Sequence, residues 1–334
     1  IRARRGTGQD LYEWLLKWFN PSPEIAGGDP DKLLDIAPYP GDENLPFGHD
    51  LAERLTLTLP RSDNATATWW FDDLPHTLVT IQGLRRAPEV GHMTAERQAG
   101  DHVFSLFDRF PEHTVMVLTL TARPQDFTRN HIAQVKRAAV GDSAEAELTR
   151  EDAEAVEREM ARGNKLYPLG MAFYVRGDDV KTLRANVNQL NALLLPNGLQ
   201  PILHESDLLA LDSYLRNLPM AYDASLDKAS RRSRLVFSSH TANLLPLYGR
   251  SKGTGHPGLV FFNRGAEPLV FDPLHRADRK KNAHMLILGP TGAGKSALLV
   301  YLLQQMAAVY RPRIFIIEAG GSFSLLGQQF QAYG

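Results

Sequence analysis

The segment GPTGAGKS, from Gly289 to Ser296, has residue types and a spacing that could bind phosphate. It matches the pattern G-x-x-x-x-G-K-[ST], in which glycines let successive backbone N–H groups converge on an anion. The lysine then reaches the β- and γ-phosphates, and the serine hydroxyl ligates Mg²⁺. The sequence therefore predicts ATP and Mg²⁺ as cofactors, with Ser296 on the metal and a loop formed by Gly289, Pro290, Thr291, Gly292, Ala293, Gly294, Lys295, Ser296 and Ala297.

The flanking segments predict the elements that would hold this loop in place. The apolar segment HMLILG (284–289) predicts a strand that enters it, and Ser296 to Tyr310 predicts a helix that leaves it, with its positive dipole end toward the phosphate. The segment RIFIIE (313–318) predicts a second strand that ends in Glu318. Lys295 is thus the first candidate catalytic residue and Glu318 the second, although a carboxylate at a strand end is also common for structural reasons.

Composition limits the class of protein. The chain has 334 residues, of which 43% are hydrophobic and 22% charged, as in soluble globular proteins, and its formal net charge of −1 indicates no global basic field for nucleic acid. The absence of cysteine excludes disulfides, thiolate metal sites and cysteine nucleophiles. The sequence has no apolar run long enough to span a membrane. The eleven histidines are not closely paired along the chain, so their spacing predicts no structural metal site.

The order of the expected elements predicts an α/β fold in three regions. Residues 1–45 form an N-terminal helix and linker, 46–235 a mixed α+β domain with a ferredoxin-like or related split sheet, and 236–334 the first part of a RecA-like P-loop ATPase domain. The N-terminal helix, Asp10 to Phe19, carries an aromatic stripe that includes Trp14 and Trp18. That stripe could pack on the protein's own core or meet a membrane surface or a partner.

Within the middle region, alternation and apolar periodicity predict individual elements. The expected strands are Ala65–Phe71, His76–Leu84, Thr114–Ala122 and Met171–Gly177. The expected helices are Thr94–Phe110, one beginning near Gln125, Ser143–Arg162 and Asp178–Leu195.

The run between Asn243 and Pro273 makes the phosphate loop more specific. GLVFF and PLVFD predict a hairpin joined by NRGAE, shortly before the loop. This order resembles the conjugative transfer ATPases of type IV secretion systems, the TraC and TrbE type that includes the large VirB ATPases. The matching elements are Gly253, Gly255 and Pro257, then Phe271, Asp272 and Pro273, then Asn282. Beyond the loop, Glu318, Gly320 or Gly321, and Ser322 resemble the family's second motor strand, with Glu where Asp is more common.

The resemblance implies an ATP-binding motor subunit that drives pilus assembly or the transfer of DNA or protein. It implies a homo-oligomer, hexameric in the family, at the cytoplasmic side of the bacterial inner membrane. The implied partners are inner-membrane components of the secretion system, with DNA or a relaxase–DNA complex as a further possibility. Two alternatives are a DNA-pumping hexamer of the FtsK and HerA sort, and a docking module that does no catalysis.

The ends of the sequence predict a piece of a longer protein, because it lacks an initiator Met and ends at Gly334, soon after the loop. On this interpretation the motor domain is incomplete, and its second acidic motif and arginine finger lie outside the chain. The isolated chain is therefore expected not to hydrolyse ATP above background.

Overall fold

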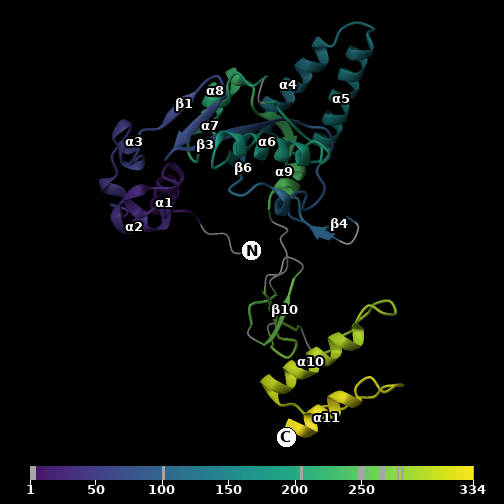
Figure 1. Ribbon diagram of the computed structural model, residues 1–334. Helices are drawn as coiled ribbons and strands as arrows, with labels where there is room; N and C mark the ends of the chain where they lie inside the picture. Colours follow the sequence, from purple (N-terminus) through teal and green to yellow (C-terminus); the bar gives the residue numbers. More distant parts are fainter. Residues whose placement is uncertain are drawn as a thin grey trace. The chain divides into compact units, whose positions relative to one another are not determined.

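The computed structural model describes residues 5–99, 102–203, 206–246, 253–256, 258–263, 268–276, 278–279 and 282–333. The chain divides into two compact units (Figure 1). Unit 1 comprises Ile1–Ala95 and Ser105–Tyr248, and unit 2 comprises Glu96–Phe104 and Gly249–Gly334.

Unit 1 is built on a seven-stranded sheet in the order β1-β2-β3-β7-β6, with β8 paired to β3 and β9 paired to β7. All of its described strand pairs are antiparallel. The strands are β1 (Arg61–Asp63), β2 (Thr68–Phe71), β3 (Leu74–Leu84), β6 (Val115–Leu120), β7 (Leu166–Arg176), β8 (Leu199–Pro201) and β9 (Arg234–Phe237).

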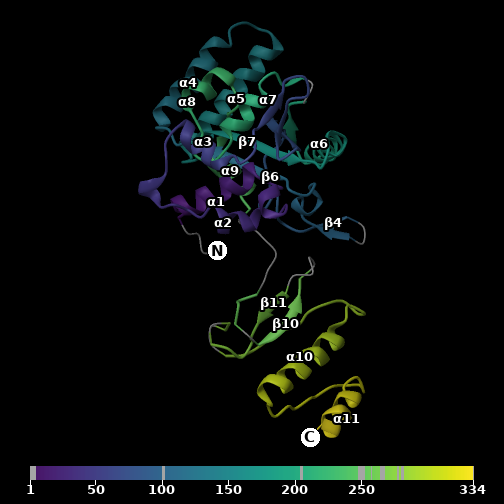
Figure 2. The same ribbon diagram turned by 60° about the vertical axis from the view of Figure 1, so that its left-hand side comes forward.

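Helices cover both faces of the large sheet (Figure 1, Figure 2). Side chains alternate along a strand, so β7 supplies both faces. Phe173 lies in a core cluster with apolar residues of α6 (Val180–Leu194). Tyr174 lies in a second cluster with Tyr214 of α7 (Ala210–Arg216). Two covered faces explain why β7 is apolar along most of its length.

The N-terminal segment packs on unit 1 through α1 (Gly8–Phe19), α2 (Leu33–Ile36) and α3 (His49–Leu55). Buried Asn20 ties this segment together: its amide donates to the carbonyls of Leu16 and Leu55 at 2.7 Å each and accepts from the backbone of Leu57. Trp18 of α1 stacks edge-on against Tyr174 at 4.9 Å between ring centroids. Of the two roles open to the aromatic stripe, Trp18 therefore takes the one within the protein's own core.

Two helices, α4 (Gln125–Ala138) and α5 (Ala144–Ala161), form a hairpin that extends from the sheet (Figure 1). Ile132 and Met160 pack with Leu166 at its base. The ammonium of Lys136 bridges Glu154 and Glu157 at 3.2 and 3.0 Å. The remaining helices of unit 1 are α8 (Ala224–Ser230) and α9 (Ser238–Leu244).

Unit 2 contains two antiparallel strand pairs, β4 (Arg97–Ala99) with β5 (His102–Phe104), and β10 (Leu259–Phe262) with β11 (Pro268–Phe271). The second pair is followed by α10 (Lys295–Tyr310) and α11 (Ser324–Tyr333). A hydrogen bond of 2.8 Å from Gln304 to Gln329 joins the two helices. Large apolar side chains stay exposed in the segments before and after α10, among them Leu286, Leu288, Phe315 and Ile317.

The mixed α/β class, the β2–β3 and β10–β11 hairpins and the helices at α1, α4, α5, α6 and α10 confirm the sequence predictions. The helix predicted over Thr94–Phe110 is wrong: part of that stretch forms β4 and β5, and Gly100 within it disfavours a continuous helix. The strands predicted at 284–289 and 313–318 are also wrong in the described structure. Their backbones pair with no described segment, and a strand exists only through such pairing. The ferredoxin-like and RecA-like arrangements stay predictions.

Candidate functional site

The loop at 289–296 has the backbone conformation that its glycines allow. Gly292 and Gly294 have φ of +83° and +82°, in the left-handed region where a side chain would be strained. Gly294 is also the N-cap of α10, and its carbonyl accepts from Leu298 N–H at 2.9 Å. The loop therefore delivers the chain directly into the first turn of a helix, whose N–H groups favour an anion.

Lys295 is the first residue of α10 and folds back over the loop. Its ammonium donates to the carbonyl oxygens of Gly289 and Pro290 at 2.8 and 2.7 Å. A Cβ placed on Gly289 would lie 3.4 Å from Ala293 Cβ and 3.5 Å from Lys295 Cγ, which is a close fit. Both acceptors are neutral, so phosphate oxygens could replace them with stronger, charge-assisted bonds.

The other predicted loop residues are accessible to a ligand. Ser296 lies in the first turn of α10 and is exposed, so its hydroxyl is available to Mg²⁺ beside a bound phosphate. Exposure is shared by the rest of the loop, Thr291, Gly292, Ala293 and Ala297. The residues present thus fit a nucleotide phosphate with its metal ion.

Glu318 lies outside any described strand. Its side chain is exposed, and its carboxylate accepts from the backbone N–H of Phe323 at 3.5 Å. That contact is local to the turn before α11. A catalytic role for Glu318 stays a prediction.

The hairpin before the loop holds α10 in place. The backbone N–H of Val260 in β10 donates to Gln305 at 2.8 Å, and its carbonyl accepts from the hydroxyl of Tyr301 at 2.8 Å. Tyr310, the last residue of α10, donates to the carboxylate of buried Asp272. Sequence reasoning singled out Asp272 only by resemblance and missed the three α10 residues, although polar side chains at 301, 305 and 310 interrupt an otherwise apolar helix.

The approach segment that resembled a family pattern also has a structural role. A Cβ on Gly253 would lie 1.9 Å from the carbonyl oxygen of Val270, so only glycine can lie this close to β11. Thr254 then donates its backbone N–H to the same carbonyl at 2.9 Å. Asn282 is exposed, and Pro257 lies outside the described residues.

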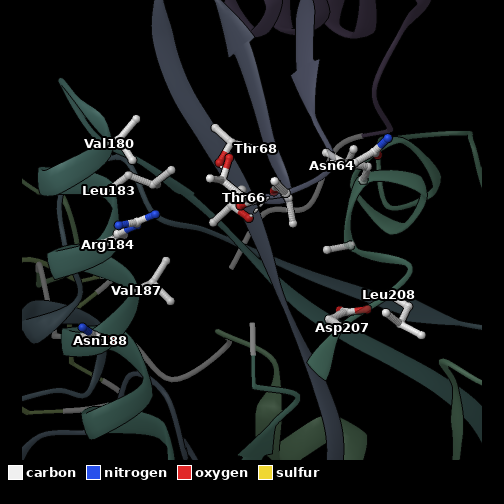
Figure 3. A pocket seen from close by; sticks show the side chains of 15 residues that line it. Asn64, Thr66, Thr68, Val180, Leu183, Arg184, Val187, Asn188, Asp207 and Leu208 are labelled. Atoms are coloured by element: carbon white, nitrogen blue, oxygen red, sulfur yellow. Dashed lines mark hydrogen bonds between the residues drawn. The ribbon is translucent and has the colours of Figure 1, made fainter. Parts of the chain in front are cut away.

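Unit 1 contains a separate cavity of about 810 Å³ (Figure 3). Arg184 of α6 reaches into it from one side, Thr66 and Thr68 line it, and Asp207 and Leu208 lie opposite. Asp207 is already paired with Arg232. The cavity thus offers hydroxyls and a guanidinium, while the phosphate chemistry indicated by the sequence lies in unit 2.

Comparison with known proteins places these features in context. The family model described as TraC protein matches residues 1–222. A conjugal transfer protein TrbE of Rhizobium radiobacter is 30% identical over 119 residues, which cover 34% of this chain and 14% of that protein. A probable conjugal transfer protein TrbE of Sinorhizobium fredii is 30% identical over 123 residues, which cover 34% of this chain and 17% of that protein. The chain therefore spans less than a fifth of the length of these curated relatives. A search of the described helices for a candidate membrane span found none.

Proposed function

The chain belongs to the TraC family of conjugal transfer proteins, and from this premise we propose that it carries the ATP-binding loop of a conjugation or type IV secretion motor. One observation carries the proposal: Lys295 opens α10 directly behind a loop whose glycines adopt left-handed conformations. In the full-length protein, ATP hydrolysis would drive pilus assembly or substrate transfer.

In this proposal each loop residue has a defined task. The backbone N–H groups from Gly292 to Lys295 orient the phosphates, and Lys295 moves from two neutral carbonyls onto them. Ser296 holds Mg²⁺, which neutralises charge between the phosphates. The proposal includes a RecA-like motor domain after a ferredoxin-like N-terminal domain. It also includes a hexamer at the cytoplasmic face of the inner membrane that contacts secretion components, with DNA or a relaxase–DNA complex as cargo.

The test is binding of a fluorescent ATP analogue to the 334-residue chain in Mg²⁺. We expect Lys295→Ala to weaken binding by roughly a hundredfold, because the phosphates lose a charge-assisted donor. Lys181→Ala, in α6 of unit 1, is the matched control and should bind as the parent does. Equal binding by parent and Lys295→Ala would refute the assignment of the loop.

The same protein separates the two alternatives. A DNA-pumping translocase would bind duplex DNA with an affinity that falls steeply with salt. A docking module would bind inner-membrane secretion components equally well with and without nucleotide. Nucleotide binding that depends on Lys295, without such DNA binding, would favour the secretion motor.

A further inference from the structure

Three side chains with metal-binding atoms meet in unit 2, outside the phosphate loop. They are His256, His275 and Asp278, and one ligand atom of each lies within 4.8 Å of the other two. The two imidazole rings stack with centroids 4.3 Å apart and planes 20° apart. Asp278 and His275 lie in one turn after β11, while His256 comes from the segment that runs along β11.

The carboxylate of Asp278 is buried but only partly satisfied. Its side chain is 1% exposed, and its Oδ1 has no hydrogen-bond donor among the described residues. That oxygen lies 3.6 Å from Nε2 of His256, too far for a hydrogen bond. Two ligands of a tetrahedral ion at the usual bond lengths are separated by roughly 3.4 Å, which is close to this spacing.

The other oxygen of Asp278 fixes the direction of the carboxylate. Oδ2 accepts from the Thr254 hydroxyl at 2.5 Å and from the backbone N–H of Asp272 at 2.7 Å. Burial alone would raise the pKa of Asp278, but these hydrogen bonds and the neighbouring imidazoles hold it below its ordinary value. The group is therefore an anion whose Oδ1 faces His256. Such outer contacts are what orient ligands in metal sites.

We propose that His256, His275 and Asp278 form a binding site for a divalent first-row transition cation, with Zn²⁺ as the best fit. Two imidazoles and a carboxylate suit Zn²⁺ far better than Mg²⁺ or Ca²⁺, which prefer oxygen ligands throughout. Three protein ligands leave a fourth position for water. His275 is exposed, so a small rotation of its ring brings all three ligand atoms to bonding distance of one ion.

The role of this site is to brace the chain before the phosphate loop. The ion ties the approach segment, fixed on β11 by Gly253 and Thr254, to the turn that follows the same strand. Asp272 extends the brace, since it donates to Asp278 and accepts from Tyr310 at the end of α10. A small unit with few buried apolar residues gains most from such a staple.

The test is Zn²⁺ binding by the tag-free 334-residue chain, measured by competition with a chromogenic chelator. We expect one Zn²⁺ per chain, with affinity at least tenfold weaker in His256→Ala, His275→Ala and Asp278→Asn. Asp278→Asn keeps an oxygen for Thr254 and Asp272, so it removes the ligand with little change to the fold. His131→Ala, an exposed histidine of α4, is the control and should bind as the parent does.

Lys295→Ala should also retain Zn²⁺ binding, which separates this proposal from the nucleotide site. Equal Zn²⁺ binding by the parent and His256→Ala would overturn the site, because surface histidines would then account for it. No binding by the parent at 100-fold excess of Zn²⁺ over protein would overturn it too, and would leave His256 and Asp278 as an ion pair. Binding that needs the histidines but not Asp278 would refute the three-ligand arrangement.

Discussion

Unit 1 and unit 2 differ in how their apolar residues are covered. In unit 1 both faces of the sheet lie under helices, and residues such as Phe173 and Leu190 are fully buried. In unit 2 the buried apolar residues described are Leu259, Leu302 and Leu326, while Leu288 and Ile317 are exposed. The phosphate loop depends on local backbone geometry and a few polar contacts, whereas the sheet of unit 1 depends on packing between distant segments. The two units should therefore respond differently to mutation, pH and ligands.

The largest expected difference concerns core truncation. Phe173→Ala should lower the free energy of unfolding by roughly 3–5 kcal/mol, because it removes a buried ring and leaves a cavity beside Phe110. Phe262→Ala in β10 should change it by less than about 0.5 kcal/mol, since that ring is 67% exposed. Chemical denaturation of both variants measures the contrast. Similar losses would mean that unit 2 has a core of its own.

Acid should destabilise unit 1 through His76. Burial, with Arg176 and His113 nearby, lowers the pKa of His76 to about 3, from an ordinary value near 6.5. Between these values the unfolded chain binds a proton that the folded chain does not, so stability falls as pH drops below 6.5. At pH 5 the loss from this group is roughly 2 kcal/mol.

Denaturation curves between pH 7.5 and pH 5 test this expectation. His76→Gln should flatten the pH dependence, whereas exposed His131→Ala should keep it. An unchanged slope in His76→Gln would show that other groups cause the acid sensitivity.

A smaller effect is expected at the start of α1. Thr7 caps this helix: its hydroxyl accepts from Asp10 N–H at 3.2 Å, and the Asp10 carboxylate accepts from Thr7 N–H at 2.7 Å. Thr7→Ala should lower the stability of unit 1 by about 1 kcal/mol, as loss of a helix cap does. Thr149→Ala, within α5, removes only a hydroxyl bonded to the preceding turn and should be neutral. A stability change in the control as large as in Thr7→Ala would refute the cap's role.

The smallest expected signal is ATP turnover by the 334-residue chain, which we expect at background. Residues 284–288 and 313–317 form no described sheet, and Glu318 is exposed, so nothing described holds a carboxylate on an attacking water. Phosphate release at saturating Mg²⁺ and ATP measures this. Turnover that Lys295→Ala abolishes would contradict the expectation and make Glu318 the first candidate for the missing carboxylate.

The sequence predicted what depends on near neighbours in the chain. The loop is defined by eight consecutive residues, and the β10–β11 hairpin by two apolar runs with a turn between them. The strands expected at 284–289 and 313–318 failed because an apolar run reports a need for cover and says nothing about which segment supplies it.

Contacts between distant residues could not be predicted in the same way. Trp18 belongs to the core only because Tyr174 of β7 and Tyr214 of α7 lie beside it. His256 and Asp278 are 22 positions apart, and they meet because Gly253 lets its segment lie against β11. Histidine spacing alone therefore gave no sign of this cluster.

The exposed apolar side chains near α10 also affect how the protein behaves in solution. Leu286, Leu288, Phe315 and Ile317 lie in short β-prone segments without proline, the kind that drive self-association between copies of a chain. With a formal net charge of −1 and a pI near 6.9, the molecule has little charge repulsion at neutral pH to oppose this. Its colloidal solubility should therefore be lowest near pH 7 and should improve as the buffer moves to higher pH.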